Sequence, residues 1–306
     1  MVRRILFDEI KEWLSEDKII IIKGTRRAGK TTLLGQIKDY LEKCEQKALY
    51  LSVDQEPTNP IFSEPKYFLR YLKEQYGVNE DKRTYVLLDE FQYIREAGLF
   101  LKVIHDIAHK YLTIIATGSS GLELSKNREF LTGRKAEFIL NRFSFIEFLW
   151  GTSEYKYNYC WDLSENSKDL KEFYAVYKDD LERRFLEYAN WGGYPEVCLQ
   201  GNLKKKEILL KEIIITYVQK DIVDFLKVGN VSAFNNLVSL LSHQVGSLLN
   251  KVEVCNTLGI HFRTLENYLD ILKGTFIFSF LKPFFTNIRK ELSKMPKIYA
   301  DDMGVI

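Results

Sequence analysis

Short apolar runs alternate with longer amphipathic segments over the first half of the chain. The apolar runs cover residues 19–22, 48–53, 85–88, 112–117 and 136–140. Between and before them, apolar residues recur at helical spacing in 5–14, 31–40, 66–76 and 99–109. An apolar run without alternation is typical of a strand that is covered on both faces. The pattern therefore predicts an α/β core in which helices cover both faces of a five-stranded parallel sheet.

The pattern changes near residue 143, and the second half of the chain is predicted to be mainly helical. Long helices are expected over 168–189 and 203–226, separated by the turn Gly192-Gly193-Tyr194-Pro195. Two shorter segments, 251–258 and 263–272, have the length of a helix-turn-helix, and the β-rich residues 275–281 would form a wing. We expect three domains: a core over 1–150, a helical lid over 151–228 and a winged-helix domain over 229–306.

The first apolar run leads into Gly24-Thr25-Arg26-Arg27-Ala28-Gly29-Lys30-Thr31-Thr32, which has the spacing of a P-loop. Such a loop turns backbone N–H groups around a phosphate, and the helix that follows directs its positive dipole end at the anion. Lys30 would reach the β- and γ-phosphates, and the Thr31 hydroxyl would bind Mg²⁺. The alternative is a glycine turn that joins a strand to an amphipathic helix. The motif favours nucleotide binding.

The third apolar run ends in the acidic pair Asp89-Glu90. After a P-loop, such a pair has the position of a Walker B element. Asp89 would hold Mg²⁺ through water, and Glu90 would orient and deprotonate the attacking water. The alternative is a strand that leaves the core at two charged residues.

Hydroxyl side chains follow the fourth apolar run, at Thr117, Ser119 and Ser120. Because ligands bind at the carboxyl ends of parallel strands, one of these hydroxyls could contact the γ-phosphate or the attacking water. A simple glycine-serine turn explains them equally well.

Three arginines are candidates for contact with phosphate. Arg134, just before the fifth run, could supply positive charge to the transition state as an arginine finger, or could be a solvated side chain. Arg26 and Arg27 lie within the P-loop and could meet phosphate or a neighbouring subunit, or lie at the surface.

The second helix of the predicted helix-turn-helix begins with Arg263 and Asn267, where a DNA reader places its base contacts. The flanking wing is apolar, and a basic cluster comes only from Arg289, Lys290, Lys294 and Lys297. DNA contact and packing against protein are both open, and the apolar wing favours protein.

The overall composition limits the classes of function. The 306 residues are 46% apolar and 28% charged with a formal net charge of +2, so no global basic field favours nucleic acid. The cysteines, Cys44, Cys160, Cys198 and Cys255, lack the spacing of a zinc site or a redox pair. Acidic residues close to the amino terminus, Asp8 and Glu9, predict that there is no signal peptide. The lack of an apolar run of membrane-spanning length predicts a cytoplasmic protein without membrane contact.

A series of motifs extends over nearly the whole chain. They are the P-loop, Leu88-Asp89-Glu90-Phe91-Gln92, Thr117-Gly118-Ser119-Ser120, Leu131-Thr132-Gly133-Arg134, Phe143-Ser144-Phe145-Ile146-Glu147-Phe148, Gly192-Gly193-Tyr194-Pro195-Glu196-Val197, Lys220-Asp221-Ile222 and Lys297-Ile298-Tyr299-Ala300-Asp301-Asp302-Met303-Gly304. In this order they resemble archaeal and bacterial AAA+ superfamily (STAND-like) ATPases. In these proteins a P-loop core is followed by a winged-helix domain of unknown function.

The resemblance implies a five-stranded ATPase core, a helical lid and a winged helix. In STAND-type ATPases a Gly-x-Pro turn of the lid packs on adenine, and by that analogy Pro195 would contact the base. Family members continue into a domain that resembles restriction nucleases, whereas this sequence ends at Ile306, so the resemblance supports no nuclease activity here. Arg142 stands where the family tends to have proline, a local departure that touches no chemical group.

These observations predict a protein that binds ATP or ADP with Mg²⁺, hydrolyses ATP slowly and acts as a conformational switch toward a protein partner. The alternative is an ATP-regulated DNA-binding protein that docks through the winged helix and loses affinity steeply as salt rises. A third possibility is a phosphotransferase, which would release ADP only when a small-molecule acceptor is supplied. The oligomeric state stays open, as does whether Arg134 acts on its own or a neighbouring subunit.

Overall fold

The computed structural model describes residues 1–55, 58–118, 131–153, 157, 167–216 and 230–305. The chain forms two compact units, Met1–Gly151 and Thr152–Ile306. Among the described helices, none combines the length and the apolar character that crossing a bilayer requires.

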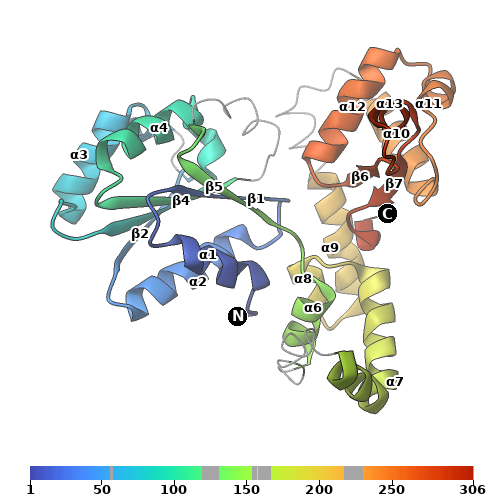
Figure 1. The fold of residues 1–306 in the computed structure, drawn as a ribbon, viewed down its shortest axis with the longest axis horizontal. Coiled ribbons are helices and arrows are strands. Elements are labelled where there is room, and N and C mark those ends of the chain that lie inside the picture. Colours follow the sequence, from blue (N-terminus) through green and yellow to red (C-terminus); the bar gives the residue numbers. More distant parts are fainter. Residues whose placement is uncertain (56–57, 119–130, 154–156, 158–166, 217–229, 306) are drawn as a thin grey trace. The chain divides into compact units, whose positions relative to one another are not determined.

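The first unit is built on a five-stranded sheet (Figure 1). Its strands are β1 (Ile19–Gly24), β2 (Lys47–Ser52), β3 (Thr84–Asp89), β4 (Leu112–Gly118) and β5 (Lys135–Leu140). They lie in the order β2-β3-β4-β1-β5, and every pair is parallel. The predicted α/β class with a five-stranded parallel sheet is therefore confirmed.

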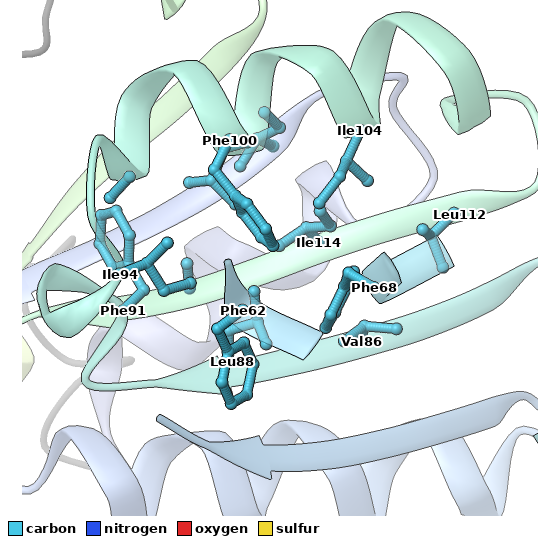
Figure 2. Packing of buried hydrophobic residues seen from close by; sticks show 14 of the residues in the cluster. Phe62, Phe68, Val86, Leu88, Phe91, Ile94, Phe100, Ile104, Leu112 and Ile114 are labelled. Carbon is cyan, nitrogen blue, oxygen red and sulfur yellow. The ribbon is translucent and has the colours of Figure 1, made fainter. Parts of the chain in front are cut away.

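Helices cover both faces of this sheet. They are α1 (Ile5–Trp13), α2 (Lys30–Lys43), α3 (Pro65–Tyr76) and α4 (Ala97–Ala108), with short 3-10 turns η1 (Pro60–Phe62) and η2 (Phe91–Tyr93), and a further helix, α6 (Phe145–Thr152), follows β5. Successive residues of a strand point to opposite faces. Thus Ile20 and Ile22 of β1 pack with α1 and α2, whereas Ile19 and Ile21 join the cluster formed with α3 and α4. Figure 2 shows part of this second cluster, in which Phe68 and Phe100 meet edge to face.

The carboxyl ends of β1, β3 and β4 lie along one edge of the sheet. The register pairs Lys23 of β1 with Gly118 of β4, and Leu88 of β3 with Ala116 of β4. The residues that follow these strands are therefore held close together, as the sequence pattern predicts. This edge carries the P-loop.

The second unit begins with three helices, α7 (Ser167–Trp191), α8 (Pro195–Cys198) and α9 (Leu203–Thr216). Helices α10 (Val231–His243), α11 (Lys251–Leu258) and α12 (Phe262–Gly274) follow, and then β6 (Phe278–Leu281), α13 (Ile288–Ser293), β7 (Lys297–Ala300) and η7 (Met303–Val305). Strands β6 and β7 pair antiparallel, and Leu248 forms a further bridge to Lys297. The apolar segment expected to be a wing supplies only β6, whose partner comes from 297–300. The name winged helix stays an interpretation of this order of elements.

The residues after β7 return to the turn between α7 and α8. The carboxylate of Asp302 accepts hydrogen bonds from the backbone N–H of Gly193 at 2.7 Å and of Gly304 at 2.9 Å. A single unit thus contains both segments that the sequence pattern divides into a lid over 151–228 and a winged-helix domain over 229–306. Lys220-Asp221-Ile222 lies outside the described residues.

Candidate nucleotide-binding site

The loop between β1 and α2 is compact and its backbone is unusual. Arg27 and Gly29 both have left-handed backbone dihedrals, with φ of 59° and 93°. Gly24 has no room for a side chain, because a Cβ atom there would lie 2.2 Å from the carbonyl oxygen of Leu140 on β5. Alternation of right- and left-handed residues turns successive N–H groups to one side, which makes a concave site for an anion. Helix α2 begins at Lys30, directly after this loop.

Lys30 is buried and folds back onto the loop that precedes it. Its Nζ donates hydrogen bonds to the carbonyl oxygens of Thr25 at 2.9 Å and of Gly24 at 3.3 Å. The ammonium group thus bonds to backbone carbonyls of the loop itself, at the edge of the sheet where a phosphate would bind.

Asp89, at the end of β3, accepts hydrogen bonds from three hydroxyl groups. Thr31 Oγ1 lies 2.6 Å and the Tyr50 hydroxyl 2.8 Å from its Oδ2, and Thr117 Oγ1 donates to Oδ1. Asp89 is 2% exposed. Hydroxyl and carboxylate oxygens are the hard ligands that Mg²⁺ prefers, so Thr31 and Asp89 fit the metal predicted from the sequence.

Tyr50 is a site residue that sequence analysis misses. It lies on β2 beside Leu87 of β3. Burial raises the pKa of its phenol to about 12, and the hydrogen bond to Asp89 acts in the same direction. At neutral pH Tyr50 is therefore a hydrogen-bond donor to Asp89. No local motif marks it, because its role depends on β2 being the neighbour of β3.

Glu90 is held by its surroundings in a strained position. Its φ is 54°, a left-handed value that costs a side-chain-bearing residue free energy. Its backbone N–H donates to Thr117 Oγ1 at 3.3 Å, and its carboxylate accepts a hydrogen bond from Gln92 Nε2. Thr117 thus connects Asp89 to Glu90. Ser119 and Ser120, the other two hydroxyl candidates, lie outside the described residues.

Arg134 lies away from this constellation. It precedes β5, its carbonyl oxygen accepts from Ile19 N, and the next residue, Lys135, pairs with Ile19 at the start of β1. The P-loop begins at the other end of β1, about 20 Å away along the strands. The guanidinium forms an ion pair with Asp106 at 2.6 Å, and this hydrogen bond lowers the pKa of Asp106. This position contradicts an action of Arg134 on the nucleotide of its own subunit. An action on a neighbouring subunit stays a prediction.

The remaining candidates have simpler positions. Arg26 and Arg27 are partly exposed on the P-loop, and Thr32 is exposed in the first turn of α2. Pro195 is the first residue of α8 in the second unit, preceded by the buried Tyr194. Its contact with adenine stays a prediction. Cys44, Cys198 and Cys255 are free thiols, and burial raises the pKa of Cys198 to about 12, so that this thiol is unreactive.

Comparison with known families gives two matches. Residues 16–149 match the family described as "AAA domain", and residues 182–306 match a family described as "Domain of unknown function". The first match covers the five strands and the P-loop described above. Residues 16–149 are thus similar to AAA domains. The expected order, an AAA+ core followed by a domain of unknown function, is thereby confirmed.

Two similar proteins are uncharacterized. An uncharacterized protein of Methanocaldococcus jannaschii is 30% identical over an alignment of 305 positions, which covers 96% of this chain and 63% of that protein. An uncharacterized protein of Haemophilus influenzae is 25% identical over an alignment of 307 positions, which covers 97% of this chain and 70% of that protein. The chain thus spans about two thirds of the length of these relatives.

Among solved structures, AMPPCP-bound DnaA from Aquifex aeolicus is similar to this chain. It is 15% identical, with a TM-score of 0.36 over 88% of this chain and 94% of that one. A replication initiator DnaA bound to AMPPCP and single-stranded DNA has a TM-score of 0.37 over 89% and 88%, at 14% identity. At these values the fold assignment rests on the sheet topology and the AAA domain match.

Proposed function

We propose that the AAA domain binds ATP with Mg²⁺ and hydrolyses it. The observation that carries this proposal is the bonding of Thr31, at the start of α2, to Asp89, at the end of β3. These residues come from the two motifs that a P-loop ATPase uses to hold its metal. The P-loop itself lies beside them, with Lys30 directed at the loop's own carbonyl oxygens.

Each of these residues has a role in the proposed reaction. Lys30 exchanges its contacts with the Thr25 and Gly24 carbonyls for contacts with the β- and γ-phosphates. Thr31 and Asp89 would hold Mg²⁺, which when bound neutralises charge on the phosphates. Glu90 positions the attacking water and accepts its proton, and because Gln92 donates to Oε2, the water would bind at Oε1.

The proposed output is a conformational change of the second unit. The turn at residues 192–195 would contact the base through Pro195, so that the unit responds to the nucleotide. The hydrogen bond between Gly193 and Asp302 supports this view, because it connects that turn to the segment after β7. Movement of the turn would be passed directly to the C-terminal residues of the chain.

The deciding experiment is ATP binding and single-turnover hydrolysis by wild type, Lys30→Ala and Glu90→Gln, each with and without Mg²⁺. We expect Lys30→Ala to lose binding, and Glu90→Gln to bind ATP without cleaving it. Equal cleavage by Glu90→Gln and wild type would exclude Glu90 as the base. Failure of wild type to bind ATP would exclude the function itself.

The same assay separates the two kinds of output. Duplex DNA is added at several salt concentrations. Stimulation of hydrolysis that fades steeply with salt would support docking on DNA. A rate that does not respond to DNA supports a switch directed at protein, which we favour because Phe284 and Ile288, after β6, are exposed apolar residues.

A further inference from the structure

A buried arginine from the amino terminus lies against the P-loop. Arg4, the residue before α1, is 3% exposed. Its Nη1 donates to the carbonyl oxygen of Ala28 at 2.7 Å and its Nη2 to that of Asn141 at 2.6 Å. The guanidinium also lies over the ring of Phe143, 5.0 Å from its centroid. A single side chain thus connects the chain start, the P-loop and the segment after β5.

Glu147 on α6 fixes this arginine in place. Its Oε1 accepts from Arg4 Nε and from the backbone N–H of Ile5, both at 2.9 Å. Its Oε2 accepts from the N–H of Ser144 at 2.9 Å, while Ser144 Oγ accepts from the N–H of Glu147, which is the reciprocal capping arrangement at a helix start. The carboxylate is therefore held by three donors from two elements, independently of any ligand.

The contact with Ala28 has a geometric consequence for the next residue. No cis peptide bond occurs in the described residues, so the bond between Ala28 and Gly29 is trans. In a trans peptide the C=O and the following N–H point in opposite directions. Because Arg4 draws the Ala28 oxygen toward itself, the N–H of Gly29 is directed away from Arg4. Gly29 is the loop residue directly before Lys30.

We propose that Arg4, held by Glu147, is a positioning residue that orients the Ala28–Gly29 peptide so that the Gly29 N–H faces a bound phosphate. The inference rests on the proposed function, because it concerns the affinity of the same loop for nucleotide phosphates. Arg4 touches no substrate atom and acts through the loop backbone. A lysine in its place could keep the ion pair but could not reach three acceptors in different directions.

The test is Arg4→Lys, with Glu147→Gln as second variant and Arg70→Lys as control. Arg70 forms an exposed ion pair with Glu74 on α3, away from the site. The affinities for ADP and AMP are measured by competition against a fluorescent ATP analogue, and thermal melting is recorded for each variant. ADP carries the β-phosphate that a P-loop binds, and AMP lacks it.

We expect Arg4→Lys to weaken ADP binding about 10- to 100-fold. This is the loss that follows when one charge-assisted hydrogen bond, here from the Gly29 N–H to the phosphate, is removed. AMP binding should change less than threefold, and Arg70→Lys should match wild type for both ligands. A general structural defect would weaken ADP and AMP alike and would overturn the proposal, as would wild-type ADP affinity in folded Arg4→Lys.

Glu147→Gln decides the matter if Arg4→Lys does not fold. It keeps the size of the side chain and an acceptor for Arg4 but removes the charge. We expect a selective loss of ADP affinity, and an unchanged ratio of ADP to AMP affinity would overturn the proposal. Absence of nucleotide binding in wild type is a different outcome, because it would reject the proposed function rather than the role of Arg4.

Discussion

The hydroxyl of Tyr50 on β2 donates a hydrogen bond to the carboxylate of Asp89 on β3, with 2.8 Å between the two oxygens. The contact joins an edge strand of the sheet to the candidate metal ligand, and it orients that carboxylate together with Thr31. A carboxylate that has lost one of its donors is freer to rotate, so Tyr50 should influence metal binding without touching the metal.

Tyr50→Phe removes this donor and leaves the ring in place. We expect the Mg²⁺ concentration that supports half-maximal hydrolysis to rise about tenfold, the effect typical of a lost partner of a metal ligand. Hydrolysis is measured over a Mg²⁺ titration at constant ATP. Tyr76→Phe, which alters an exposed tyrosine at the end of α3, should leave the titration unchanged. A titration of Tyr50→Phe that coincides with wild type would show that Asp89 is positioned without this hydroxyl.

Gln92→Ala should increase the rate of hydrolysis. The amide of Gln92 donates to one carboxylate oxygen of Glu90, and a donor on a carboxylate makes it a weaker acceptor for a proton from water. Removing it should raise the single-turnover rate about threefold to tenfold, because a hydrogen bond to a charged group contributes roughly 1.5–3 kcal/mol and water replaces part of it. ATP affinity should stay constant. A lower rate would show instead that Gln92 holds Glu90 in its working position.

Glu137→Gln should destabilise the first unit in a pH-dependent way. Lys23, buried at the end of β1, forms an ion pair with Glu137 at 2.8 Å. Burial alone would raise the pKa of Glu137, but hydrogen bonds from Lys135 and Lys23 outweigh it and lower the pKa below the usual 4.5. The ionised pair therefore stabilises the fold above pH 4.5, and this stabilisation is lost as the pH falls through the lowered pKa.

We expect Glu137→Gln to lower the free energy of unfolding by about 2 kcal/mol at pH 7, less than for a fully buried pair because Glu137 is partly exposed. Below pH 4 the difference from wild type should shrink toward zero. Urea unfolding at several pH values measures it. Glu42→Gln, which breaks an exposed pair with Lys38, is the control and should change stability by less than about 0.5 kcal/mol. A difference that stays constant with pH would reject the ionic explanation.

Gly192→Ala should destabilise the second unit. Gly192 has a φ of 74°, and a Cβ atom there would lie 1.9 Å from Oδ1 of Asp302. The substitution forces Asp302 away from Gly193 and strains the backbone, at a cost of about 2–4 kcal/mol. Thermal melting followed by circular dichroism measures the loss. Gly201→Ala meets no atom within 4 Å and should melt close to wild type.

The sequence predicts the parts of the site that are set by local geometry. The spacing from Gly24 to Thr31 is typical of a loop that closes around a phosphate. An acidic residue at the end of a buried parallel strand must lie at the carboxyl edge of the sheet. Both motifs, and the fold class, can therefore be recognised from residue types and their spacing alone.

Other features depend on which strands and side chains become neighbours. Tyr50 matters because β2 lies beside β3, and Arg4 because α6 brings Glu147 to it. Neither relation leaves a pattern in a single sequence. The sequence leaves open whether Arg134 acts on its own or a neighbouring subunit, and the direction of the strands leaves only the neighbour as a prediction. A residue before a parallel strand lies at the amino edge of the sheet, so the same rule that places Asp89 at the site places Arg134 away from it.

The strand order also determines when the loop can form during synthesis of the chain. Although β1 is the first strand made, both of its neighbours, β4 and β5, are translated roughly a hundred residues later. At a translation rate of about 5–20 residues per second, β1 is therefore an unpaired apolar segment for several seconds. Unpaired strand edges of this kind are prone to aggregate. Arg4 must wait longer still, until α6 emerges with Glu147. A nascent chain that stalls before residue 112 would thus carry a complete P-loop sequence with neither neighbour of β1, and we expect chaperones to bind it.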